Sequence, residues 1–166
     1  MNLSDMHFPR QLEADGSTDT IRAALARQLV RLGPEGVLKV PLLTFNKSLE
    51  TAIRKARLQR RVRLGLDDIL EKLAAEKKGL DELQQKTAAP HQDRISRLLL
   101  FSDDGAERLY HNIETTLIAH SPRILGCMLN IKGGEIGQII TGKTIAVKVI
   151  LIEHKDAVSD ILRALI

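Results

Sequence analysis

The most specific pattern of residues in this 166-residue chain is GQIITGKT, at positions 137–144. It satisfies the phosphate-loop pattern G-x-x-x-x-G-K-[ST], in which backbone N–H groups surround the phosphates of a nucleotide and the lysine neutralises them. The residues that would carry this chemistry are Gly137, Gly142, Lys143 and Thr144. The match raises the question of whether the chain binds a nucleotide.

The neighbours of this motif argue against a phosphate loop. A genuine loop follows a strand, and a helix begins at its lysine. Here a helix-like segment, 135–140, comes before Lys143, and the β-branched residues of 145–152 favour a strand after it. We therefore interpret the match as accidental, expect no nucleotide or other cofactor, and predict that Gly142 ends a helix in the left-handed conformation.

A second candidate for phosphate chemistry is the basic segment 52–63, which carries six cations and no acid. The forked donors of arginine suit phosphate groups, so a nucleic-acid surface is the leading hypothesis. The alternative is a solvated helix face, balanced by acids elsewhere in the chain such as Asp67 and Glu71. The candidate nucleic-acid-binding residues are Arg54, Lys55, Arg57, Arg60, Arg61 and Arg63.

A third candidate consists of polar residues that follow two predicted strands. Asp103 and Asp104 follow the first, and Glu153, His154 and Asp156 follow the last. If these strands are parallel, their carboxyl ends share one edge of the sheet, where the acids could hold a hard cation and His154 could carry a proton. The alternative, which the sequence favours, is that these residues cap helices and complement their dipoles.

These candidates belong to two unlike halves of the chain. Residues 1–88 have mainly helical periodicity, which predicts an all-helical N-terminal region containing the basic helix. Small and polar residues at 89–94 predict a linker. Residues 95–166 alternate apolar runs with amphipathic stretches, which predicts a small three-layer α/β domain with a mostly parallel sheet. Its strands are expected at about 95–101, 123–129 and 144–152.

The composition limits the classes of function. Aromatic residues make up only 2% of the chain, which leaves little for stacking single-stranded bases. The single cysteine, Cys127, excludes an internal disulfide and is expected to be buried and inert. The single cysteine also favours a reducing cytoplasm, and because no apolar run is long enough to cross a membrane, we expect no membrane partner. The net charge is +4, and residues 1–90 carry all of the excess, with 16 Lys and Arg against 12 Asp and Glu.

The C-terminal stretch GEIGQIITGKTIAVKVILI, followed by HKDAVSDILRAL, resembles the ribosomal-protein family that binds kinked RNA turns. The resemblance spans at most residues 95–165 and rests on a glycine, a short helix, a Gly-Lys turn and a strand rich in Ala and Val. It implies alternating strands and helices and an RNA partner. It assigns none of the family's RNA-contacting residues to a position in this chain.

The sequence thus favours a non-catalytic binding or regulatory module that contacts nucleic acid through its basic helix, since no pattern of nucleophile and base is present. Two alternatives stay open. One is a small ligand- or metal-binding, enzyme-like domain that uses the acidic strand ends, and the other is a structural or protein-interaction domain. A second copy of the chain is another candidate partner, because short amphipathic helices need a partner for their apolar faces.

Overall fold

A six-stranded mixed sheet forms the centre of the fold in a computed structural model that describes residues 2–87 and 93–166. The strand order is β1-β2-β5-β4-β6-β3. Strands β2, β5 and β4 run parallel to one another, whereas β1, β6 and β3 are each antiparallel to their neighbour. The strands are β1 (Leu29–Arg31), β2 (Lys39–Leu43), β3 (Val62–Leu64), β4 (Arg97–Phe101), β5 (Ile124–Leu129) and β6 (Val149–Ile152).

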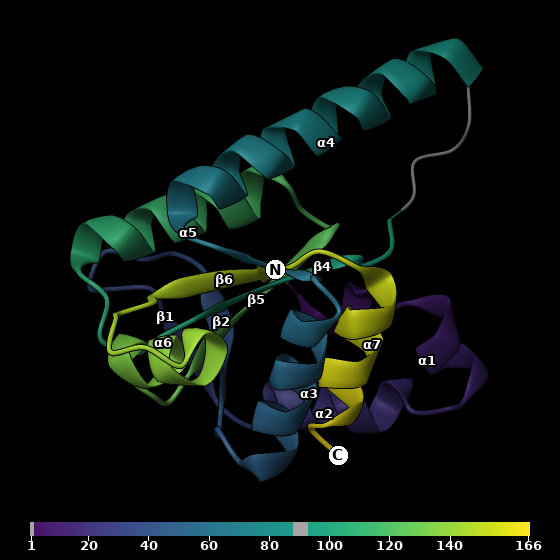
Figure 1. The fold of residues 1–166 in the computed structure, drawn as a ribbon. Coiled ribbons are helices and arrows are strands. Elements are labelled where there is room, and N and C mark those ends of the chain that lie inside the picture. The colour runs from purple at the N-terminus through teal and green to yellow at the C-terminus, as the bar shows by residue number, and fades with distance from the viewer. Residues whose placement is uncertain (1, 88–92) are drawn as a thin grey trace.

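Helices cover both faces of this sheet (Figure 1). Helices α4 and α5 lie on one face, and α1, α2, α3, α6 and α7 lie on the other. The α-helices of the described residues are α1 (Arg10–Ala14), α2 (Thr18–Ala26), α3 (Lys47–Leu58), α4 (Leu66–Thr87), α5 (Glu107–Ala119), α6 (Gly133–Thr141) and α7 (Lys155–Arg163). A 3-10 turn, Leu3–Asp5, precedes α1. The three-layer α/β class predicted from the sequence is confirmed.

The central strands β4 and β5 are recognisable in the sequence because both of their faces are buried. In β4, Leu98 and Leu100 face the core beneath α3 and α7, while Leu99 and Phe101 face the core beneath α4 and α5. A strand buried on both faces is a continuous apolar run rather than an alternating one. The predictions at 95–101 and 123–129 are therefore confirmed by β4 and β5.

The expectation of an all-helical N-terminal region is not met, because three strands fall within residues 1–88. β2 pairs with β5 and β3 pairs with β6, so strands from both halves of the chain share one sheet. β1 and β3 have only three residues each, too few for a period of two to be visible. The predicted linker at 89–94 falls mainly on residues 88–92, which lie outside the described residues.

The expectation that the last predicted strand is parallel to β4 is also wrong, because β6 pairs with β4 antiparallel. Helix α6 begins at the edge of the sheet where β4 and β5 end. The segment 143–148 then returns the chain to that edge, since Val147 N–H donates to the carbonyl of Gly133 at 2.9 Å. β6 therefore starts beside the end of β4, with Val149 opposite Phe101, and is shorter than the predicted 144–152.

The buried residues of helix α4 lie in its first half, and Lys77 near its middle donates to the carbonyl of Ala119 at the end of α5. Helix α4 runs through Gly79 without a break. Ile69 and Leu73 are its buried residues, and the later turns extend beyond the sheet (Figure 1). Glu76 lies where α4 leaves the body and contacts Arg97 of β4 and Arg123 just before β5. This carboxylate is the last strong link between α4 and the sheet.

Candidate nucleic-acid interface

The basic segment forms the second half of α3 and the turn into β3. The helix begins at an Asn46 cap, whose side-chain oxygen accepts from the N–H of Leu49 at 2.9 Å. Leu49, Ile53 and Ala56 form its buried face. The cations therefore lie on the faces of α3 that point away from the core.

Three of the six predicted cations are paired with acids. The pairs are Arg54–Glu50 (3.6 Å), Lys55–Asp160 (3.3 Å) and Arg63–Glu153 (2.8 Å). Arg54 also donates to the carbonyl oxygen of Ile139 at 3.2 Å. The hydrogen bond to Glu153 raises the pKa of Arg63, so this guanidinium stays charged. These three cations connect α3 and β3 to α6, α7 and β6.

The other three cations, Arg57, Arg60 and Arg61, have no acid partner among residues 2–87 and 93–166. Residues 57–60 are all exposed, and Arg61 is half-buried. The turn therefore lies at the surface of the protein. We call residues 57–61 the arginine turn.

The backbone of the arginine turn is a Schellman motif. Arg61 N–H donates to the carbonyl of Ala56 at 2.9 Å, and Arg60 N–H donates to the carbonyl of Arg57 at 3.0 Å. Arg60 has a φ of +59° and is the one non-glycine residue with positive φ in the described parts of the chain. Glycine is usual at this position, because other residues are strained there by roughly 1–2 kcal/mol. Stability alone would not select arginine here.

The acidic candidates do not converge on one site. Because β6 is antiparallel to β4, Asp103 and Asp104 lie at one edge of the sheet, and Glu153, His154 and Asp156 lie at the opposite edge. Within the described residues, no group of three or more His, Cys, Asp or Glu side chains is placed to hold a metal ion. The acids therefore do not form the cation site that parallel strands would have allowed.

Each of these candidates has a partner of its own. Asp103 pairs with Lys132 at 2.9 Å, and Asp104 pairs with Lys148 at 3.2 Å and accepts from the N–H of Gly133 at the start of α6. At the other edge, His154 is the N-cap of α7, since its Nδ1 accepts from the N–H of Asp156 at 3.1 Å. Gln11 donates to the Asp156 carboxylate. His154 and Asp104 thus accept from N–H groups at the starts of α7 and α6, as the helix-cap alternative expects, whereas Asp103 forms an ion pair and does not cap α5, whose N-cap is Ala106.

The phosphate-loop match lies at the end of a helix, as its neighbours indicated. Gly142 has a φ of +71°, and its N–H donates to the carbonyl of Gln138 at 3.0 Å, so it is the C-cap of α6. Lys143 and Thr144 are exposed and no helix begins at them. Gly137 is needed for packing, because an added Cβ would overlap the carbonyl oxygen of Ile145.

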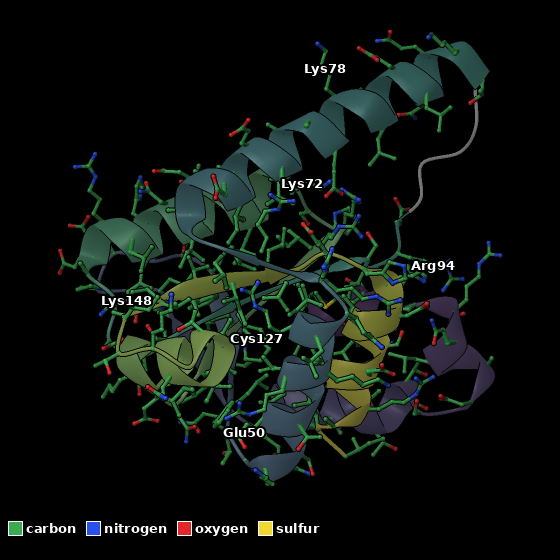
Figure 2. All side chains as sticks on the ribbon, in the orientation of Figure 1. Glu50, Lys72, Lys78, Arg94, Cys127 and Lys148 are labelled. Atoms are coloured by element: carbon green, nitrogen blue, oxygen red, sulfur yellow. The ribbon has the colours of Figure 1, made fainter. Side chains whose placement is uncertain are left out.

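Cys127 is completely buried in β5, as expected (Figure 2). Burial raises the pKa of its thiol far above the usual value, so the reactive thiolate is not accessible at neutral pH.

Sequence reasoning missed two surface clefts beside the N-terminal segment, of about 380 and 460 Å³. They share Ser4 and Arg22. The guanidinium of Arg22 donates to two backbone carbonyls of the N-terminal segment and lies 4.9 Å from the centre of the Phe8 ring. Arg22 thus fastens that segment to α2. This role of Arg22 could not be predicted from a local sequence pattern, because the partners of Arg22 are backbone carbonyls and one aromatic ring.

Comparisons with known proteins leave the function open. No family model matches the chain, and a search of curated proteins finds no match. Among solved structures, the Giardia lamblia 15.5kD RNA binding protein is similar, with 9% sequence identity and a TM-score of 0.47, over 71% of this chain and 81% of that one. Likeness at this level supports no conclusion about function. No helix in the described residues is long and apolar enough to cross a membrane.

Proposed function

We propose that this protein is a non-catalytic nucleic-acid-binding module and that the arginine turn is its contact surface. The observation that carries the proposal is the contrast within the basic segment. Three of its cations have acids as partners, whereas Arg57, Arg60 and Arg61, at the exposed C-terminal end of α3, have none in the described chain.

Phosphate is the ligand that best suits this arrangement. Arg57, Arg60 and Arg61 carry three like charges within five residues of the chain, and a bound anion would relieve the repulsion between them. Arginine can also donate two parallel hydrogen bonds to one phosphate. The N–H of Glu153 donates to the carbonyl of Arg61 at 2.9 Å, so the segment that leads into α7 lies beside the turn.

A salt series tests this proposal. We expect the logarithm of the association constant for mixed-sequence RNA and DNA to fall linearly with the logarithm of the salt concentration. The double variant Arg57→Gln/Arg61→Gln should lower this slope by about 2, since each lost phosphate contact removes about 0.9. Fluorescence anisotropy at several salt concentrations measures both slopes.

A matched control removes two cations from another surface. Lys78 and Lys86 are exposed on the later turns of α4, which extend beyond the sheet and which we call the free part of α4. Lys78 points outward from that helix (Figure 2). Lys78→Gln/Lys86→Gln changes the net charge equally but should leave the slope unchanged. Equal losses in both double variants would attribute binding to net charge, and binding that is absent or independent of salt would exclude the proposal.

The variant Arg60→Gly separates folding from binding. Glycine adopts the left-handed conformation without strain, so the free energy of unfolding should rise by about 1 kcal/mol. Affinity for nucleic acid should fall, because one phosphate contact is lost. Urea denaturation and the same anisotropy assay measure the two effects. As a control, Gln59→Gly at the neighbouring position, with a φ of −83°, should lower stability. A stability loss in both variants would mean that Arg60 is not strained.

A further inference from the structure

Leu58 is an exposed leucine in the middle of the arginine turn. Its side chain is 85% exposed, more than any other large hydrophobic side chain of the described residues. The apolar residues of α3 that pack on the core are Leu49, Ala52, Ile53 and Ala56, and Leu58 is not among them. Glutamine or lysine would form a helix about as well, so neither packing nor helix propensity accounts for leucine at this position.

The surroundings of Leu58 decide what could contact it. Arg57 precedes it, and Arg60, the left-handed residue at which the chain reverses, and Arg61 follow it. A cationic surface with an apolar centre matches a partner that offers phosphates around an apolar surface. The groove of a nucleic-acid duplex has this composition, because phosphates line its two sides and sugars and base edges form its floor.

The aromatic residues argue against single strands as the preferred ligand. Proteins that bind single strands stack the bases on exposed aromatic rings. Phe8, Phe101 and Tyr110 are buried, and Phe45 is partly buried against the core. The four aromatic residues of the chain therefore offer no stacking platform at the arginine turn.

We infer that the arginine turn enters a groove of double-stranded nucleic acid, where Leu58 contacts the sugars and base edges while Arg57, Arg60 and Arg61 bind the flanking phosphates. This inference rests on the proposed function above. Proteins that bind the minor groove combine apolar side chains and cations in the same way. Leu58 supplies apolar contact area, and the arginines supply the dependence on salt.

Affinities for duplex and single-stranded oligonucleotides of one sequence test the inference. The unmodified protein should bind a 20-base-pair duplex, of RNA or of DNA, about tenfold more tightly than either single strand. Leu58→Gln should weaken duplex binding about tenfold, the loss expected when a buried leucine contact is removed. It should leave the salt slope and single-strand affinity unchanged, because no phosphate contact is lost.

The control is Leu83→Gln, which changes an exposed leucine on the free part of α4 and should leave duplex affinity unchanged. Both leucines are exposed, so both variants should keep the melting temperature of the unmodified protein. Equal affinity for duplex and single strands, or unchanged duplex binding by Leu58→Gln, would overturn the inference. In either case the salt slope carried by the arginines would persist, whereas failure of the proposed function would remove that slope.

Discussion

Replacing Gly137 by alanine is expected to lower the free energy of unfolding by about 3 kcal/mol, at the upper end of the usual cost of overpacking. An added Cβ would overlap the carbonyl oxygen of Ile145 and lie 2.8 Å from its carbonyl carbon. Both are backbone atoms of the segment that leads from α6 into β6. They cannot rotate away as a flexible side chain would, so the helix or the segment must shift. Urea denaturation measures the loss.

Gly134→Ala is the matched control, because Gly134 lies in the same helix and has open space around the Cβ position. Alanine is a better helix former than glycine, so this variant should gain up to about 1 kcal/mol. The pair also tests the phosphate-loop interpretation. A glycine of a phosphate loop would be required for nucleotide binding, whereas a packing glycine is required for stability. Similar stability of the two variants would contradict the packing role of Gly137.

The α/β class and the central strands could be predicted because they depend on local signals. β4 and β5 are apolar along their whole length, since helices cover both of their faces. The end of α6 was predictable for a similar reason, because Gly142 follows an apolar helical stretch and precedes a β-branched run. In both cases the signal lies within a few residues of the feature.

The direction of β6 has no such local signal. Whether β6 is parallel or antiparallel to β4 depends on where the segment 143–148 takes the chain, and that depends on its contact with Gly133. The acids at the ends of β4 and β6 were expected to meet only because the strands were taken as parallel. One antiparallel strand therefore separates the residues of the candidate cation site, which the sequence had favoured less than helix caps.

The candidate interface shows the same division between local and distant information. The sequence identified the basic segment but could not show which cations are free, because their partners are remote. Lys55 pairs with an acid 105 positions away, and Arg63 with one 90 positions away. The left-handed conformation of Arg60 was equally hidden, since a glycine normally marks this helix ending and none occurs between Arg54 and Arg63.

Replacing Glu76 by glutamine is expected to lower the free energy of unfolding at pH 7 by about 3 kcal/mol, since breaking a buried ion pair leaves charges without a partner. Only 12% of the Glu76 side chain is exposed, and it pairs with Arg97 at 2.9 Å and with Arg123. Glutamine can replace some hydrogen bonds but not the charge. The two guanidiniums would then face each other, and α4 would lose its link to the start of β4. Glu82→Gln, an exposed position on the same helix, should change stability by less than about 0.5 kcal/mol.

The pH dependence distinguishes the charge of Glu76 from its shape. Burial alone would raise the pKa of Glu76, but the hydrogen bonds and charges of Arg123 and Arg97 outweigh it and lower the pKa below its usual value. A group whose pKa is lowered by folding stabilises the protein fully above its unfolded pKa, about 4.3 for glutamate, and loses this effect as the pH falls through the folded value. The difference between the unmodified protein and Glu76→Gln should therefore be constant from pH 6 to 7 and shrink below about pH 4. Urea denaturation at several pH values measures it. A difference that persists undiminished at acid pH would assign the role of Glu76 to packing rather than to its charge.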